Sequence, residues 1–297
     1  MGLVGLLPES GVTRDGTYDL ILSSEPAVLV AGLITGELDA AALPLNVAAA
    51  LYASTGGVRV IASTNLGALF AVTGNESVRD LYDLSGLTMY SPGLGTTPQL
   101  VVDTLSASGW FGSGGSSTTM ADDSAADVEP EVIFVAEAAE VVARLAADPN
   151  LVGVLPEPFA TSALASGLGL RQVGDLGVAW SEVTGADLVV GVLVVADGLS
   201  PELTAELRAD TANSVAWVNA NPGAAGVLIA GLGILPDAQL ASAAVPRARL
   251  VALTGVDLYL SGNATLEAMF AAFPALVGGA IPGASFFWTP EIELIDD

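Results

Sequence analysis

The stretch that decides the fold is S-P-G-L-G-T-T-P-Q, residues Ser91 to Gln99. It follows an apolar strand predicted over Leu87 to Tyr90 and leads into an apolar helix beginning at Pro98. Two glycines allow a tight turn, Thr97 is expected to cap the helix, and proline suits a first helical turn. A strand, a glycine-rich turn and a helix in succession are typical of α/β sheets that bind ligands beyond the carboxyl ends of their strands. A tight turn that binds no ligand is the alternative.

The same order of strand and helix recurs along the chain. Further apolar strands are predicted over 18–22, 38–43, 58–62, 68–72, 132–135, 151–155 and 188–196. Helices are predicted to start near residues 2, 26, 46, 137, 159 and 200, and residues 63–67 are expected to form a polar turn. The run over 188–196, L-V-V-G-V-L-V-V-A, has the valine-rich character of a strand buried on both faces. This alternation predicts an α/β fold.

The composition excludes several functions. Eight basic residues, all arginine, stand against 33 acidic residues, which gives a net charge of -25. Such a surface repels phosphate backbones and anionic lipids, so we expect no nucleic-acid partner. The chain has no histidine and no cysteine, which excludes disulfides, thiolate zinc sites, cysteine nucleophiles and histidine-based acid–base catalysis. We expect neither a cofactor nor a metal site.

The mean hydropathy of +0.63 is high, but the apolar runs are shorter than the ~18 residues that a spanning helix needs. We therefore assign the hydropathy to buried cores. The first residues, M-G-L-V-G-L-L, have neither the basic start nor the cleavage pattern of a signal peptide. Residues 112–128 are polar and low in complexity and are predicted to form a mobile surface loop. Their acidic residues lack the spacing of a calcium loop.

Five stretches, taken in order, resemble the solute-binding proteins of ABC importers, in the group that includes nitrate-, sulfonate- and taurine-type receptors. They are G-E-L-D-A-A-A-L-P-L-N-V-A-A-A-L-Y from Gly36, D-L-S-G-L-T-M-Y-S-P-G-L-G-T-T-P-Q from Asp83, A-E-A-A-E-V-V-A-R-L from Ala136, V-L-P-E-P-F-A-T-S-A-L from Val154 and N-A-N-P-G-A-A from Asn219. The resemblance covers nearly the whole chain. It implies an α/β, two-lobed type II periplasmic binding protein fold, with a mostly parallel sheet flanked by helices in each lobe.

The resemblance also implies the domain boundaries, the function and the partners. Residues 1–85 and 188–297 would form lobe 1, and residues 86–187 would form lobe 2. The protein would capture a small molecule in the cleft between the lobes and deliver it, as a monomer, to the permease and ATPase subunits of an importer. Its location would be extracytoplasmic, periplasmic or anchored on the outer face as a lipoprotein.

Carried over position by position, the resemblance places the ligand-binding residues on strand-end turns. They would be Ser23, Ser24, Pro44, Asn46, Thr64, Asn65, Gly95, Thr96, Thr97, Glu137, Pro156 and Glu157. None of these loops carries an arginine, so an anionic ligand would depend on backbone donors, hydroxyls and helix dipoles. With Glu137 and Glu157 facing the cleft, we expect a neutral or cationic small molecule.

The chain departs from the family in two places. Members usually begin with a strand and a Gly-Pro-Thr-like turn before the segment that starts here at Met1. One sheet strand, one pocket loop, the signal sequence and any lipid-anchoring cysteine would then lie upstream. Relatives also often carry a histidine where this chain has Ala138, which indicates a different ligand.

Two other functions compete with the receptor. Glu157 lies between two prolines at a strand end, where it could act as the acid or base of an enzyme similar to the menaquinone-pathway lyases that share this fold. Its structural alternative is a carboxylate that stabilises a helix N-terminus. The thiamine-pyrimidine synthases also share the fold, but their chemistry requires histidine and cysteine. A ligand-sensing or structural module of an envelope assembly is the third class.

Overall fold

The computed structural model describes residues 1–13, 17–23, 25–94, 96–111 and 128–289. The chain divides into two compact units, each described here by itself. Unit 1 consists of Met1–Leu66 and Ala186–Asp297, and unit 2 of Gly67–Gly185. The expected first boundary, between residues 85 and 86, therefore has to be corrected. The segment 67–85 belongs to unit 2, because its strand is hydrogen-bonded on both sides to strands of that unit.

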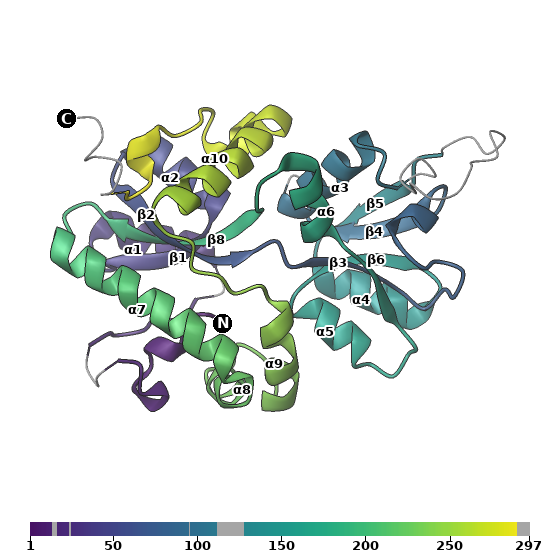
Figure 1. Cartoon of the computed structure of the whole chain (residues 1–297), viewed down its shortest axis with the longest axis horizontal. Coiled ribbons are helices and arrows are strands. Elements are labelled where there is room, and N and C mark those ends of the chain that lie inside the picture. The colour runs from purple at the N-terminus through teal and green to yellow at the C-terminus, as the bar shows by residue number, and fades with distance from the viewer. Residues whose placement is uncertain (14–16, 24, 95, 112–127, 290–297) are drawn as a thin grey trace. The chain divides into compact units, whose positions relative to one another are not determined.

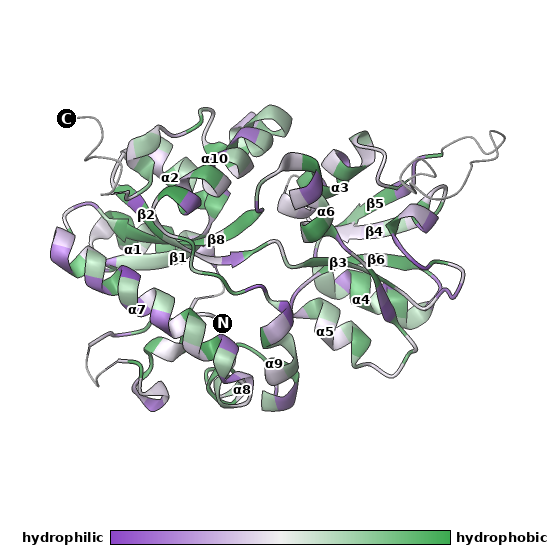
Figure 2. Ribbon diagram, in the orientation of Figure 1, coloured by the Kyte–Doolittle hydropathy of each residue, from purple (hydrophilic) through white to green (hydrophobic). Residues whose placement is uncertain are grey.

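Unit 1 contains a three-stranded sheet in the order β1-β8-β2. Its strands are β1 (Ala40–Pro44), β8 (Val189–Ala196) and β2 (Val58–Leu66). Both β1 and β2 run antiparallel to β8. As its valine-rich sequence predicts, β8 is the central strand, and four consecutive residues from Val192 to Val195 are buried. Figure 2 shows β8 in the green of apolar residues.

Helices cover both faces of this sheet. In Figure 1, α2 and α10 lie on one side and α7 on the other, where Leu207 of α7 packs with Ile61, Leu193 and Val195. A second core joins α7, α8 and α9 to the N-terminal 3₁₀ turn η1 (Val4–Leu6). The helices are α1 (Pro26–Thr35), α2 (Leu45–Thr55), α7 (Pro201–Ala220), α8 (Pro222–Gly231), α9 (Ala238–Ala244) and α10 (Gly255–Ala272).

Unit 2 contains a five-stranded sheet in the order β5-β4-β6-β3-β7. Its strands are β3 (Leu69–Thr73), β4 (Thr88–Pro92), β5 (Glu131–Val135), β6 (Val152–Pro156) and β7 (Arg171–Asp175). Figure 1 shows α3 and α6 on one face of this sheet, and α4 and α5 on the other. These helices are α3 (Thr97–Ala107), α4 (Ala138–Ala147), α5 (Phe159–Leu164) and α6 (Leu176–Thr184).

In each sheet all strands but one run in the same direction, as expected of mostly parallel sheets, and one strand is reversed. In unit 2, β4 is parallel to β5 and β6, but β3 is antiparallel to β6 and β7. In unit 1, β8 is antiparallel to both neighbours. The two reversed strands are the first ones after the chain passes from one unit to the other. They enter their sheets without the helical crossover that keeps successive strands parallel.

Other local predictions also need correction. Residues 18–22 form no strand, because no strand in the described part of the chain pairs with them. The expected polar turn over 63–67 is largely strand, since β2 continues to Leu66 opposite β8. The sequence analysis missed β7 and α6. Within the described residues, no helix combines the length and hydropathy that a membrane crossing requires.

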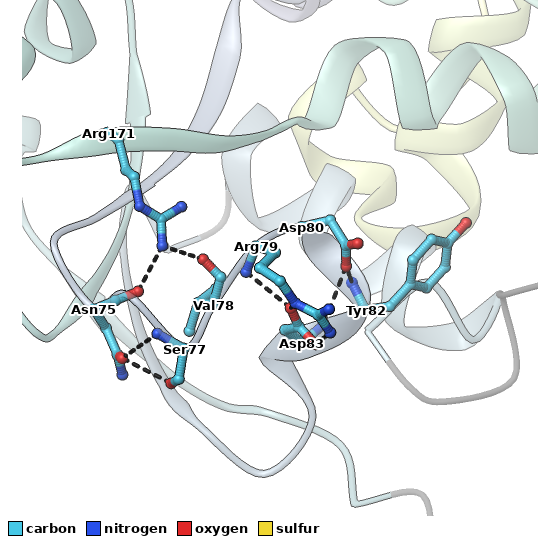
Figure 3. Close-up of polar contacts among 8 residues, drawn as sticks. All are labelled: Asn75, Ser77, Val78, Arg79, Asp80, Tyr82, Asp83 and Arg171. Carbon is cyan, nitrogen blue, oxygen red and sulfur yellow. Dashed lines mark hydrogen bonds and ion pairs between the residues drawn. The ribbon is translucent and has the colours of Figure 1, made fainter.

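One arginine organises a long turn of unit 2. Figure 3 shows Arg171 of β7 reaching the turn between β3 and the 3₁₀ segment Leu81–Leu84. Its guanidinium donates to the carbonyl oxygen of Asn75 at 2.7 Å and to that of Val78. Nearby, the exposed Arg79 pairs with Asp83 at 3.0 Å. The first arginine therefore satisfies two backbone acceptors, whereas the second forms a surface ion pair.

Replacing Arg171 with methionine is expected to lower the free energy of unfolding by about 1.5–3 kcal/mol, because hydrogen bonds from a charged donor are lost. Arg79→Met is the matched control and should change stability little, since a surface ion pair contributes little. Urea unfolding of the two variants tests this. Equal midpoints would contradict the role assigned to Arg171.

Candidate functional site

The candidate site of unit 2 lies at one edge of its sheet. The parallel strands β4, β5 and β6 end there, because Pro92 lies opposite Val135 and Tyr90 opposite Gly153. The antiparallel strand β3 begins at the same edge, where Leu69 faces Pro156. The structure thus brings together the segments that carry the predicted residues Thr96, Thr97, Glu137, Pro156 and Glu157.

The turn after β4 differs in detail from its prediction. Thr97 is the first residue of α3 and not its cap; Thr96 is the cap residue, but its side chain does not bond the helix. Both the amide and the hydroxyl of Thr96 donate to the carbonyl of Gly93, at 3.1 and 2.6 Å. The Thr96 amide is therefore engaged within the turn, whereas the Thr97 amide lies in a helical turn that offers no acceptor of its own. Gly95 lies outside the described residues.

The two glutamates of this edge have different environments. Glu137 precedes α4, is exposed and does not cap the helix with its side chain. The Oε2 atom of Glu157 accepts the amide of Thr161 at 3.3 Å, while the backbone amide of Glu157 donates to Ala68 at 3.1 Å. The Glu157 carboxylate thus supports the first turn of α5, which favours the structural interpretation over the acid–base one.

Sequence reasoning missed one acidic residue at this edge. Asp175 ends β7 opposite Phe70, and its Oδ1 accepts the amides of Gly177 and Val178, both at 3.1 Å. It is the cap of α6. An aspartate before an apolar run is a helix-start signal, so D-L-G-V from Asp175 could have revealed it.

In unit 1, the sheet brings together four predicted residues. Pro44 and Asn65 both lie opposite Gly191, from the two sides of β8. Asn46 is the second residue of α2 and not its cap, because Pro44 occupies the cap position. Thr64 donates to Asn65 Oδ1 at 3.3 Å.

A cavity of about 810 Å³ in unit 1 extends from this edge to Ser23, another of the predicted residues. Ser23, Thr64 and Asn65 line it together with mostly apolar side chains. Ser23 itself bonds locally, since its hydroxyl accepts the amide of Glu25 at 3.1 Å. Ser24 lies outside the described residues.

A segment remote in sequence also reaches the end of β2. The amide of Leu66 donates to the carbonyl of Arg249 at 3.0 Å. Arg249 has a φ of 47°, which a residue with a side chain adopts only at a cost. The tertiary structure thus places an arginine beside an edge that seemed, from its own loops, to have none. Among the described residues, no three acidic side chains cluster to hold a metal ion.

Gly191 is a further residue that sequence reasoning missed at this edge. A Cβ atom there would lie 2.3 Å from Asn65 Oδ1 and 2.5 Å from Thr64 Oγ1. Gly191→Ala is therefore expected to displace both side chains and weaken binding of a ligand held by them about tenfold, the loss of roughly one good hydrogen bond. Gly57→Ala, in the turn directly before β2, is the control, since the nearest contact of its Cβ would be an ordinary 3.6 Å. Calorimetry on both variants measures the difference.

Tyr18 makes the stability of unit 1 depend on pH in the alkaline range. Its hydroxyl donates to Asp210 of α7 at 2.8 Å. Burial, this hydrogen bond and the charges of Asp210 and Glu206 raise the pKa of Tyr18 above its usual value. Because an unfolded tyrosine titrates near pH 10, this stabilisation is present below about pH 10 and is lost as the pH rises further.

We expect the melting temperature to fall from pH 10 to 12 more steeply in the natural protein than in Tyr18→Phe. Few other groups interfere, since the chain has no lysine or cysteine. Thermal melts at steps of 0.5 pH unit give the two slopes. Over one such step, a proton bound in only one of the two states changes the free energy of unfolding by about 0.7 kcal/mol. Parallel curves would contradict the assignment.

The fold is that of ABC-importer solute-binding proteins. An ABC transporter protein from Parabacteroides distasonis superposes with a TM-score of 0.75 at 20% identity, over 92% of this chain and 88% of that one. The ligand-binding component of an ABC-type import system from Staphylococcus aureus, solved with zinc bound, gives 0.65 at 13% identity over 98% and 94%. The periplasmic aliphatic sulphonate binding protein of Escherichia coli gives 0.63 at 11% identity over 86% and 77%. By sequence, no family model and no curated protein matches the chain.

These structural likenesses establish the α/β periplasmic binding protein fold. In this chain the fold consists of two α/β units, each with polar strand-end loops. At identities of 11–20%, the ligands named for those proteins are properties of those proteins.

Proposed function

We propose that the protein is an extracytoplasmic solute-binding receptor that captures a small molecule between its two units and delivers it to the permease and ATPase subunits of an ABC importer. The observation that carries the proposal is the gathering of predicted polar residues at one sheet edge in each unit. Solved proteins of this fold include ligand-binding components of import systems. Such a role needs hydrogen-bond donors and acceptors but no reactive histidine or cysteine.

The proposed ligand is a small neutral or cationic molecule. Glu137 is exposed at the edge of unit 2 and free of a capping role, so its carboxylate is available for a positive or hydrogen-bonding group.

The experiment is native mass spectrometry of the gently purified protein, followed by a thermal-shift screen of cations, amides, zwitterions, sulfonates and nitrate. We expect a bound or stabilising compound that is recovered chemically unchanged. Glu137→Gln should weaken its binding, whereas Glu182→Gln, an exposed acid within α6, should not. A compound that the protein converts would contradict the receptor and favour an enzyme. Failure of every compound to bind would contradict the proposed ligand class.

A further inference from the structure

The cavity of unit 1 is lined mainly by apolar side chains. Many of them come from the N-terminal turns, from residues 20–22, from β1 and from α7. Ala42 of β1 lies opposite Leu193 of β8, so both side chains point to the face of the sheet that Leu207 of α7 covers. The cavity volume of about 810 Å³ falls in the range of small-molecule sites, roughly 300–1,000 Å³. The cavity is therefore large enough for a ligand held mainly by apolar contacts.

Three of the apolar side chains that line the cavity remain exposed. Leu20, Ile21 and Leu22 are 38, 60 and 54% exposed. A run of exposed apolar side chains beside a cavity often marks a place where a ligand binds. A molecule that enters the cavity covers these side chains, and each methylene group that it buries contributes to its affinity.

The charged side chains that line the cavity are all acidic. They are Asp19, Glu37, Asp39 and Glu206, and all four residues are exposed. No arginine is among the described residues of the lining. The α-amine of Met1 also lies there, and burial lowers its pKa, because the apolar interior disfavours a charge. We therefore expect a positive group of a ligand to lie among the exposed carboxylates, outside the apolar part.

The outer edge of β1 adds hydrogen-bond acceptors next to Asp39. In the described part of the chain, β1 pairs only with β8, and the amide of Ala196 donates to the carbonyl of Asp39. Residues 39, 41 and 43 therefore direct their backbone groups toward β8, and the alternate residues point the other way. Ala40 and Ala42 line the cavity, and their outward carbonyl groups can accept the N–H groups of an ammonium ion.

We propose that the cavity binds an amphipathic primary amine, with its apolar tail among the leucine side chains and its ammonium group between the carboxylates and the outer carbonyls of β1. The apolar lining accounts for the tail, and the acidic rim disfavours fatty acids and other anionic amphiphiles. The cavity shares Ser23, Thr64 and Asn65 with the predicted receptor site. It lies wholly within unit 1, and so the inference goes beyond the proposed function and does not depend on delivery to an importer.

The experiment is isothermal titration calorimetry of the 297-residue protein with hexyl-, octyl- and decylammonium chloride, each below its micelle concentration. Affinity should rise about threefold to fourfold per added methylene group, the factor for removing one CH₂ from water. Octyl sulfate should bind about tenfold more weakly than octylammonium at low salt, and added salt should shrink this difference because it screens exposed charges. Octyltrimethylammonium, which has no N–H group, should also bind more weakly than octylammonium.

Ala42→Phe tests the position of the tail. The added ring occupies part of the cavity, since Ala42 lines it and shares a face with Leu193, and should weaken octylammonium binding about tenfold by overpacking. Ala271→Phe on α10 is the matched control, because Ala271 is also exposed and α10 lies on the other side of the sheet (Figure 1). Thermal melts without ligand should show that both variants fold.

A second pair of variants tests the exposed part of the lining. Ile21→Ser should weaken octylammonium binding about threefold to tenfold, because the tail loses an apolar contact surface. Val227→Ser on α8 is its control, since Val227 is 61% exposed against 60% for Ile21 and does not line the cavity. Its affinity for octylammonium should equal that of the natural protein.

Three outcomes would overturn the proposal. Affinity that is independent of chain length, or equal for octylammonium and octyl sulfate, would show that the cavity does not select an amphipathic amine. Unchanged binding to both Ala42→Phe and Ile21→Ser would place the amine elsewhere on the protein. Absence of binding would exclude the proposed ligand class, and a dimer seen by sedimentation in that case would assign the cavity to a second copy of the chain.

Discussion

Replacing Gly226 with alanine is expected to destabilise the protein by about 1–3 kcal/mol, as overpacking a close contact does. Gly226 lies in α8 where this helix crosses α9, and it is buried. A Cβ atom there would lie 2.6 Å from the carbonyl oxygen of Ala238 and 2.8 Å from the amide nitrogen of Ser242. Both are backbone atoms, so no side-chain rotation relieves the overlap and the two helices must move apart.

The same helix provides the control. Gly231 has no atom within 4 Å of a Cβ position, so Gly231→Ala should leave stability unchanged or raise it by up to about 1 kcal/mol, because alanine is the better helix former. Denaturant melts should therefore give a lower midpoint for Gly226→Ala and an unchanged or higher midpoint for Gly231→Ala. An unchanged or higher midpoint for Gly226→Ala would show that the contact between α8 and α9 is not tight.

Ser63→Ala is expected to cost about 2–4 kcal/mol, because it takes the hydrogen-bond partner from a donor and an acceptor that are both half-buried. Ser63 is fully buried in β2. Its hydroxyl donates to Val251 at 2.5 Å and accepts the amide of Leu253 at 2.8 Å. The hydroxyl thus attaches the segment 249–253 to the part of β2 that carries Thr64 and Asn65.

Hydrogen exchange checks this assignment at one amide. The Leu253 amide should exchange much faster in Ser63→Ala than in the natural protein, while amides in the core of unit 2 should keep their rates. Ser54→Ala is the matched control: its exposed hydroxyl bonds only Leu51 within α2, and surface changes of this kind stay within about 0.5 kcal/mol. Equal exchange at Leu253 in all three proteins would contradict the role of Ser63.

The sequence predicted the elements whose signals are local. Strand β8 is recognisable from its uninterrupted apolar run, and α7 from its cap, since Ser200 accepts the amide of Leu203 as expected. The run Ser91 to Gln99 indicated a strand, a turn and a helix, which the structure contains as β4 and α3. Each signal depends on neighbours in the chain, and so it can be interpreted without knowing the partners in space. The sequence alone also excluded histidine and cysteine chemistry.

Strand direction and register required the tertiary structure. Pro44 and Asn65 meet at Gly191 only because β1 and β2 flank the same strand, which comes much later in the chain. Residues 18–22 have a strand's composition, but a strand exists only where another segment supplies its hydrogen bonds. Arg249 reaches the end of β2 for a similar reason, since Ser63 holds its segment there.

The candidate site was also only partly predictable from the sequence. The sequence shows which residue types follow each strand, and so the loops with Thr97, Glu137 and Glu157 could be identified in advance. Which groups remain available for a ligand is decided by contacts: Glu157 bonds Thr161 and Thr96 bonds Gly93, whereas Glu137 caps nothing. The sequence by itself determined the α/β class, excluded histidine and cysteine chemistry and located the polar loops. The tertiary structure decided strand order, direction and the free groups, because these depend on hydrogen bonds between residues far apart in the chain.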